Sequence, residues 1–423
     1  MNNPTAMPRK RRHRRNPNWP LISVVGGLAV AAVLYVIAAV SLHGHHHHNT
    51  SDLVVPRLLD LFVVAWFFWF GSSIGSFLNV VAWRMPRGRS INGFSACPFC
   101  AVPIRAYDNV PVFGWLNLRG RCRACRLPIA ARYPIVEALV GVSIMLVGLL
   151  GLYSGGENLP FAGASGDAHG PLRMPHITAE IIAINVYQIA ILTGAWAFAL
   201  VRVDGFRLPA RLVQFFLALS IVPMLAWPQL QQVPWQLRTQ PGGDYDSHLV
   251  ALFYIVTAVA AACVLARMMA RYVCPTADPK LDPLGKDTAR LIDLILMLTL
   301  PGIVLGWHAL IAVCAVSIVA AILLRNIFPS RGGYEWLMAV IPAAMALHLA
   351  FWRPLAQLAM WPAPNHSPAV ILGWLTAVLL LAAGLQTAAP EPIAAAIPTD
   401  SDGDNTADSE MDPEPTDNQR TSE

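Results

Sequence analysis

Two pairs of closely spaced cysteines are the residues of this chain best suited to chemistry. The pairs are Cys97-Pro-Phe-Cys100 and Cys122-Arg-Ala-Cys125. Their separation of about twenty residues is typical of a zinc ribbon, in which each pair gives two thiolates to one tetrahedral ion. Such an ion would be structural, because four thiolates leave no open coordination position. Two disulfides or four unrelated thiols are disfavoured, because the surrounding arginines predict a reducing compartment.

The composition predicts a membrane protein. Of 423 residues, 55% are hydrophobic and only 13% are charged, whereas soluble domains carry about 25% charged residues. We therefore expect an all-α polytopic membrane protein with about ten transmembrane helices, and the cysteines in a small zinc-ribbon-like insertion. The apolar runs cover residues 20–42, 58–83, 134–153, 181–201, 212–227, 249–267, 291–305, 309–324, 336–352 and 369–385.

The positive charges predict the orientation of these spans. The loop of residues 84–133 holds nine arginines against a single acidic residue, Asp108, so we expect it in the cytoplasm. The basic residues 9–15 favour a cytoplasmic N-terminus, and ten spans bring the tail to the same side. The first apolar run is long enough to be a retained helix rather than a signal peptide. Topology and attraction to anionic lipid account for the arginines, so no nucleic-acid partner is predicted.

Two segments look unlike the membrane core. Residues 43–48 are rich in histidine, and we expect a solvated outer linker, although such a run can bind metal loosely. From residue 390 to the end there are ten acidic residues and one basic residue. This acidic tail has too little apolar surface to fold and should be disordered.

Three aspartates near the ends of apolar runs are candidate catalytic groups. Asp204 ends a span, Asp293 lies inside an apolar run, and Asp287 lies in the loop before it. Acidic groups at membrane depth are costly, so each is a functional suspect. Two carboxyls held close share one proton, so such a pair can activate water and also protonate the leaving amine of a peptide. The aspartates of a transporter would instead serve as proton or ion sites.

A structural role is the alternative for the same residues. Asp204 has Arg202 and Arg207 beside it in the sequence, and either could pair with it. Arg290 lies one turn before Asp293 and is the local partner for that carboxylate.

The segment between Gly71 and Gly141 resembles the N-terminal region of the bacterial prepilin peptidases, the type IV leader peptidases. The stretches that carry the resemblance are GSFLNVVAWRMP, CPFC, RAYDNVPVFGWLNLRGRCRAC and LPIAARYPIVEALVG. The resemblance implies a cytoplasmic zinc-binding loop formed by the four cysteines and a pair of catalytic aspartates at the cytoplasmic face. It also implies a possible N-methylation of the product with S-adenosylmethionine.

The resemblance extends to the aspartates only in part. Asp204 is similar to the first catalytic aspartate of the family, which closes a helix before a short basic loop. The second aspartate of the family belongs to a GxGD motif, which this chain lacks. Asp293 is preferred because it precedes Gly306-Trp307 by thirteen residues, as in the family, whereas Asp287 keeps a preceding glycine and remains the alternative.

These features predict an aspartic endopeptidase of the bacterial inner membrane. It would cleave the leader of type IV prepilins or type II secretion pseudopilins at the cytoplasmic face. The alternatives are an inactive peptidase-like membrane scaffold, which would explain the missing GxGD, and a transporter. The expected organisation is a basic N-terminus, extra helix and histidine-rich loop (1–56), the prepilin-peptidase N-terminal region (57–141), the peptidase core (142–325), additional helices (326–388) and the acidic tail (389–423).

Overall fold

The described part of the chain is helical. The structure, a computed structural model, describes residues 18–43, 50–159, 175–230, 248–363 and 367–386. Within these ranges the only β pairings are two isolated bridges, Ala96–Pro103 and Arg121–Pro128. Both lie in the loop of residues 84–133, which carries the four cysteines and is called the tetracysteine loop below. The predicted all-α class with a small inserted loop is confirmed. Residues 44–48 of the histidine run and the acidic tail lie outside the described residues.

Nine helices of the described chain are long and apolar enough to cross a membrane. Their backbone polar groups are satisfied within each helix, as a lipid environment requires. The tenth predicted span is the shorter apolar helix α6 (Ala210–Ala226), which contains Pro223. The nine are α1 (Trp19–His43), α2 (Thr50–Arg84), α4 (Arg132–Val147, continued by the π-helix η3, Gly148–Tyr153), α5 (Ala179–Val203), α7 (His248–Val273), α8 (Lys286–Leu305), α9 (Trp307–Ile327), α10 (Gly333–Ala350) and α12 (Pro368–Ala382).

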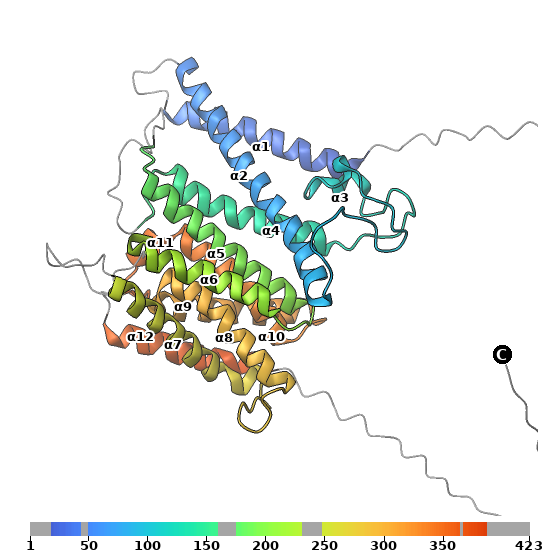
Figure 1. Ribbon diagram of the computed structural model, residues 1–423. Coiled ribbons are helices and arrows are strands. Elements are labelled where there is room, and N and C mark those ends of the chain that lie inside the picture. The colour runs from blue at the N-terminus through green and yellow to red at the C-terminus, as the bar shows by residue number, and fades with distance from the viewer. Residues whose placement is uncertain (1–17, 44–49, 160–174, 231–247, 364–366, 387–423) are drawn as a thin grey trace, which may run out of the picture. The chain divides into compact units, whose positions relative to one another are not determined.

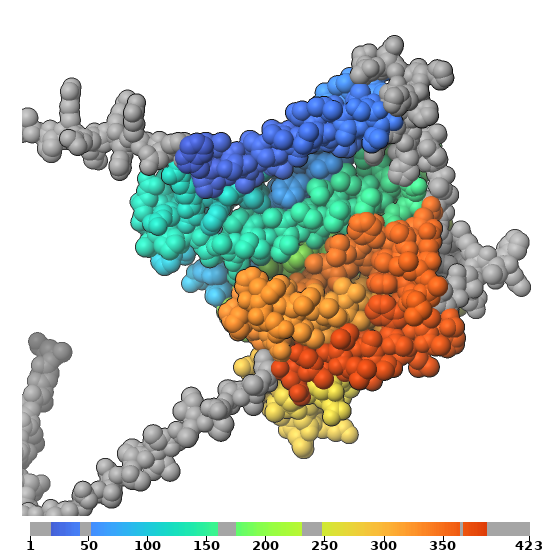
Figure 2. Space-filling view, turned by 180° about the vertical axis from the view of Figure 1, so that it is seen from behind, coloured from blue at the N-terminus to red at the C-terminus, as the bar shows by residue number. Residues whose placement is uncertain are grey.

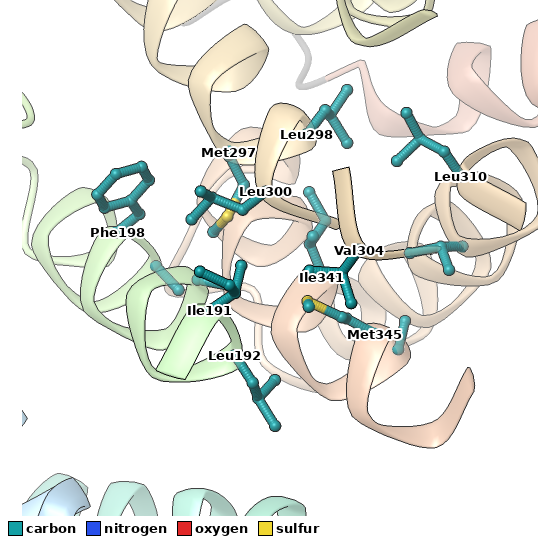
Figure 3. Close-up of a cluster of buried hydrophobic side chains, with 14 of the residues drawn as sticks. Ile191, Leu192, Phe198, Met297, Leu298, Leu300, Val304, Leu310, Ile341 and Met345 are labelled. Atoms are coloured by element: carbon teal, nitrogen blue, oxygen red, sulfur yellow. The ribbon is translucent and has the colours of Figure 1, made fainter. Parts of the chain in front are cut away.

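The core lies between α5, α8, α9 and α10. These helices are the most buried of the candidate spans. In α8, 78% of an 18-residue apolar stretch is buried inside the protein. Figure 3 shows the cluster at which they meet, where Phe198 and Ile191 of α5 lie near Met297 and Leu300 of α8. Figure 1 shows these helices lying alongside one another beneath α2 and α4. The ends of α5 and α8 are thereby fixed against each other.

Glycines hold α2 and α4 together. A Cβ atom on Gly71 would lie 3.0 Å from the Cα of Gly141, and one on Gly75 would lie 2.9 Å from the Cα of Glu137. Gly71 and Gly75 therefore lie on the face of α2 that packs on α4, where small residues allow the two helices to approach closely. Close packing of these two helices fixes the two points at which the tetracysteine loop leaves and re-enters the bundle.

The first helix, α1, is attached near its two ends. Near its C-terminal end the Tyr35 hydroxyl donates to Asp60 of α2 at 2.6 Å. Before its N-terminal end the Asn18 amide donates to the carbonyl groups of Leu116 and Asn117, at 2.9 and 3.0 Å. These carbonyls belong to α3 (Phe113–Leu118), a short helix of the tetracysteine loop. Between the two attachments the apolar surface of α1 is not buried against the other helices (Figures 1 and 2).

The glycine contact between α2 and α4 can be tested by adding one side chain. In Gly141→Val the new Cβ would lie 2.3 Å from the Ser72 hydroxyl and 3.1 Å from the Phe68 carbonyl oxygen. We expect the free energy of unfolding to fall by about 1–3 kcal/mol, measured by thermal unfolding in detergent. Gly26→Val in α1 is the matched control, because nothing lies within 4 Å of its Cβ position. Equal shifts in the two variants would contradict the close packing.

Candidate functional site

The two cysteine pairs fold into two similar knuckles. In the first, the Cys97 amide donates to Val102 and the Ala101 amide donates back to Cys97, and in the second the Cys122 and Arg126 amides make the equivalent bonds. The residue after each second cysteine has a positive φ, 56° at Ala101 and 64° at Arg126. Each knuckle therefore presents its two sulfur atoms close to those of the other knuckle.

The four sulfur atoms are arranged to bind one metal ion. The Sγ atoms of Cys97 and Cys125 are 3.8 Å apart, those of Cys100 and Cys122 are 4.0 Å apart, and all four lie within 4.8 Å of one another. A tetrahedral zinc site with Zn–S bonds of about 2.3 Å requires sulfur separations of about 3.8 Å. All four cysteines are free thiols. The donor set fits a closed, structural zinc site.

Backbone amides favour the thiolate form that a metal needs. The amides of Cys125 and Ala124 point at the Cys122 sulfur and lower its pKa to about 6. Burial and hydrogen bonding with the other three thiols raise the pKa of Cys125 to about 11, so the amides favour the thiolate form at Cys122 alone of these two ligands.

An ion pair ties the two halves of the loop together. Arg123, next to a cysteine of the second knuckle, donates to both carboxylate oxygens of Asp108 at 2.6 and 2.5 Å. Asp108 is buried, and its carbonyl oxygen would lie 2.2 Å from a Cβ on Gly114. The single acidic residue of the loop is thus a structural partner of one of its arginines, and it lies directly before the segment that leads into α3.

The tetracysteine loop contacts the membrane bundle through α4. The backbone N–H of Val112 donates to the Glu137 carboxylate at 2.7 Å. The Asn79 amide of α2 donates to the Tyr133 carbonyl group of α4 at 3.4 Å. Both contacts lie at the end of α2 and α4 from which the loop projects. Glu137 and Asn79 therefore contact the segments that join the loop to the bundle.

Asp204 lies at the C-terminal cap of α5 and pairs with an arginine of another helix. Its carboxylate is 2.5 Å from Arg132, the first residue of α4. The expected local partners, Arg202 and Arg207, were the wrong ones. The guanidinium of Arg202 has other partners than Asp204. It donates to the Phe206 carbonyl group and pairs with a residue of α8.

That residue is Asp293, and the pair is buried. The two side chains are 3.0 Å apart and only 6% and 8% exposed. The Leu208 amide, in the turn after α5, also points at the Asp293 carboxylate from 3.5 Å. The expected partner, Arg290, was again wrong: it pairs with Asp287 at 3.3 Å and with a glutamate of α10.

Asp287 has a different setting. Its carboxylate accepts from both the amide and the hydroxyl of Thr276, in the connection between α7 and α8, at 3.1 and 2.7 Å. Between Arg290 and Arg202 lies the ring of Tyr334, whose centroid is 5.3 and 5.1 Å from the two guanidinium carbons. Asp287 therefore anchors a connection, while Asp293 faces the end of α5.

The structure brings Asp204 and Asp293 to the same turn of chain. Asp204 lies two residues after Arg202, the partner of Asp293, and four residues before Leu208. Among the described residues no hydrogen bond joins the two carboxylates, and each is paired with its own arginine. Sequence reasoning therefore missed Arg132 as the partner of Asp204 and Arg202 as the partner of Asp293. The only signal in the sequence was that both are arginines near the end of a helix.

Comparison with known proteins identifies part of the chain. The described fold defines a multi-pass helical membrane protein with an inserted loop whose four cysteines could hold a metal ion. Residues 69–150 match the family model of the Bacterial Peptidase A24 N-terminal domain. Over this segment the predicted resemblance to the prepilin peptidase family is confirmed.

Three relatives show the extent of the likeness. The chain is 43% identical over 89 residues to a prepilin leader peptidase/N-methyltransferase of Myxococcus xanthus, which covers 21% of this chain and 27% of the relative. It is 40% identical over 104 residues to a type 4 prepilin-like proteins leader peptide-processing enzyme of Escherichia coli (20% and 39%). A prepilin leader peptidase/N-methyltransferase of Neisseria gonorrhoeae is 40% identical over 102 residues (18% and 36%).

The likeness has clear limits. The chain spans between about a quarter and two fifths of the length of these relatives. The matched domain ends at residue 150, so all three candidate aspartates lie beyond it. No solved structure matches the chain.

Removing one thiolate tests the metal centre. We expect Cys100→Ser to reduce zinc from about one ion per purified chain to nearly none, because a three-thiolate site loses much of its affinity. Zinc would be measured by elemental mass spectrometry, and the helical circular dichroism of the bundle should be retained. Cys263→Ser is the matched control, since Cys263 is exposed and outside the cluster. Equal zinc in both variants would contradict the assignment.

The buried pair of Arg202 and Asp293 predicts a specific stability pattern. Arg202→Gln leaves a buried carboxylate without its cation and should lower the free energy of unfolding by about 3–5 kcal/mol. Adding Asp293→Asn removes the stranded charge and should recover a large part of that loss. Thermal unfolding of the two variants in detergent measures both effects. Additive losses would show that the side chains are not partners.

Proposed function

We propose that this chain is a membrane aspartic endopeptidase that removes the leader of type IV prepilins or type II secretion pseudopilins. The observation that carries the proposal is that Asp293 contacts Arg202 and Leu208, which lie on either side of Asp204 at the end of α5, while Arg132 links Asp204 to the helix that follows the tetracysteine loop. The names of the relatives support the same activity, since they are prepilin leader peptidases.

In the proposed mechanism the two carboxylates divide the acid and base roles. One activates a water molecule, and the other, holding a proton, transfers it to the leaving amine. An arginine beside a carboxylate favours its ionised form, so at least one arginine must move away when substrate binds. The Arg132 and Asp204 pair is the more accessible, with side chains 30% and 12% exposed. The Arg202 and Asp293 pair is more enclosed, with side chains 6% and 8% exposed.

Asp293 is the better second aspartate. Asp287 is engaged by Thr276 and Arg290, away from α5. Asp293 contacts the chain on both sides of Asp204, through Arg202 and Leu208.

The proposal includes a location and a second activity. The basic loop of residues 84–133 supports an inner-membrane protein with the N-terminus, the tetracysteine loop and the tail in the cytoplasm. The four cysteines would hold a structural zinc ion. Relatives are named N-methyltransferases, so methylation of the product by S-adenosylmethionine is carried over as a possible further activity, to which we assign no residue.

An inactive membrane scaffold is the second candidate. It is favoured by the missing GxGD motif and by the separate arginine partner of each aspartate. A scaffold would retain its ion pairs as structural contacts, whereas the peptidase must break at least one of them.

Leader cleavage distinguishes the two candidates. A prepilin-like substrate from the same genome would be co-expressed with wild type and with Asp204→Asn, Asp293→Asn and Asp287→Asn, and followed by gel shift and intact mass. We expect cleavage to fall at least about a hundredfold in the first two variants, as for loss of an acid–base group, and to persist in Asp287→Asn.

Folded, zinc-loaded wild type that cleaves none of several such substrates would favour the scaffold. Loss of cleavage in Asp287→Asn but not in Asp293→Asn would exchange their roles.

A further inference from the structure

The tetracysteine loop contains a strained turn at Val112. The Phe113 amide donates to the Pro111 carbonyl group at 2.6 Å, and Val112 between them has φ 62° and ψ −56°. A three-residue turn with a positive central φ is rare and strained, and a β-branched side chain makes it more so. Such a conformation persists only where the surroundings determine it, and it is often found where structure serves function.

The contact that holds this turn comes from the membrane bundle. The Val112 amide points out of the turn, and its acceptor is the Glu137 carboxylate on α4, 2.7 Å away. The position of Glu137 is itself fixed by close helix packing, because a Cβ on Gly75 of α2 would lie 2.9 Å from its Cα. The packing of α2 on α4 therefore sets the place at which the turn docks.

The same stretch of α4 also holds Asp204. Arg132 begins the helix and pairs with Asp204, and Glu137 follows five residues later. On the loop side, Asp108 connects the segment before the turn to Arg123, beside a cysteine of the second knuckle. One and a half turns of helix therefore lie between the docking point of the loop and the carboxylate of Asp204.

We propose that Glu137 is a positioning residue that docks the tetracysteine loop on α4 and, through Arg132, couples the docking to the placement of Asp204. The catalytic consequence rests on the proposed peptidase function, but the coupling itself does not. When the Val112 turn is released, the start of α4 loses the contact that restrains it on the loop side, and the end of α5 loosens with it.

Hydrogen exchange of the full-length, zinc-loaded protein in lipid nanodiscs tests the coupling. Glu137→Leu removes the acceptor at similar size, and we expect about tenfold faster exchange at residues 108–118 and also at residues 204–206. The second segment is informative because its amides bond back to the last turn of α5. Glu137→Gln keeps an acceptor oxygen and should stay within about twofold of wild type. Glu180→Leu, at an exposed glutamate at the start of α5, is the matched control.

The outcomes separate docking from coupling. Faster exchange in both segments for Glu137→Leu, with Glu137→Gln near wild type, supports the proposal. Faster exchange at residues 108–118 alone overturns the coupling. Unchanged exchange in Glu137→Leu, or equal effects of leucine and glutamine, overturns the role of the hydrogen bond.

A second substitution tests the strained turn directly. Glycine adopts positive φ without strain, so in a Val112→Gly background the turn should form without the help of Glu137. We expect the effect of Glu137→Leu on exchange to be at least about threefold smaller in that background, as for residues that share one interaction. Independent effects of the two substitutions would overturn the proposal.

Leader cleavage provides the functional readout. In Glu137→Leu we expect kcat to fall about tenfold with KM little changed, since the reacting carboxylate and not the binding surface is displaced. Wild-type kcat in a variant with faster exchange at residues 204–206 would overturn the positioning role. Absence of cleavage in wild type counts against the peptidase function, while the exchange results still decide the coupling.

Discussion

An ionised side chain is costly in apolar surroundings, and the polar contacts of this bundle follow from that cost. Removing a charge from water costs several kcal/mol even after relaxation, so the buried acidic groups of the described helices lie against arginines. Asp60 lies 3.1 Å from Arg57 within α2, and Asp293 lies 3.0 Å from Arg202 across two helices. Arginine suits this task because its several N–H groups reach more than one acceptor. The fold around α5 is thus constrained by which arginine can reach which carboxylate.

The sequence predicts those features that depend on neighbours along the chain or on one helix face. The candidate metal site could be found because each knuckle is local and its cysteine spacing is fixed by the turn. The apolar runs gave the spans. The partners of Asp204 and Asp293 could not be found in this way. They come from helices distant in sequence, and only the packing of those helices decides between several nearby arginines.

The matched domain coincides with one structural unit. It begins at residue 69, within α2, continues through the tetracysteine loop and ends in the π-helix after α4. This unit is a helical hairpin with the tetracysteine loop inserted, held by the glycine contacts between its two helices. Asp204 ends α5, which packs against this hairpin, whereas Asp287 and Asp293 belong to α8, which packs on α5. The family match over the hairpin therefore does not include the candidate catalytic aspartates. The hairpin contacts one of them, Asp204, through Arg132, the first residue of α4.

The two attachments of α1 must also form at different times during synthesis of the chain. The contact from Tyr35 to Asp60 joins residues 25 positions apart, but the partners of Asn18 are carbonyl groups 98 and 99 positions further along the chain. At about 5–20 residues per second the ribosome needs roughly 5–20 s to make that stretch. During this interval α1 can be held in the bilayer only by its own apolar surface and by α2. Helix α1 is thus among the last of the described helices to acquire all its contacts, and its long apolar sequence can keep it in the bilayer until then.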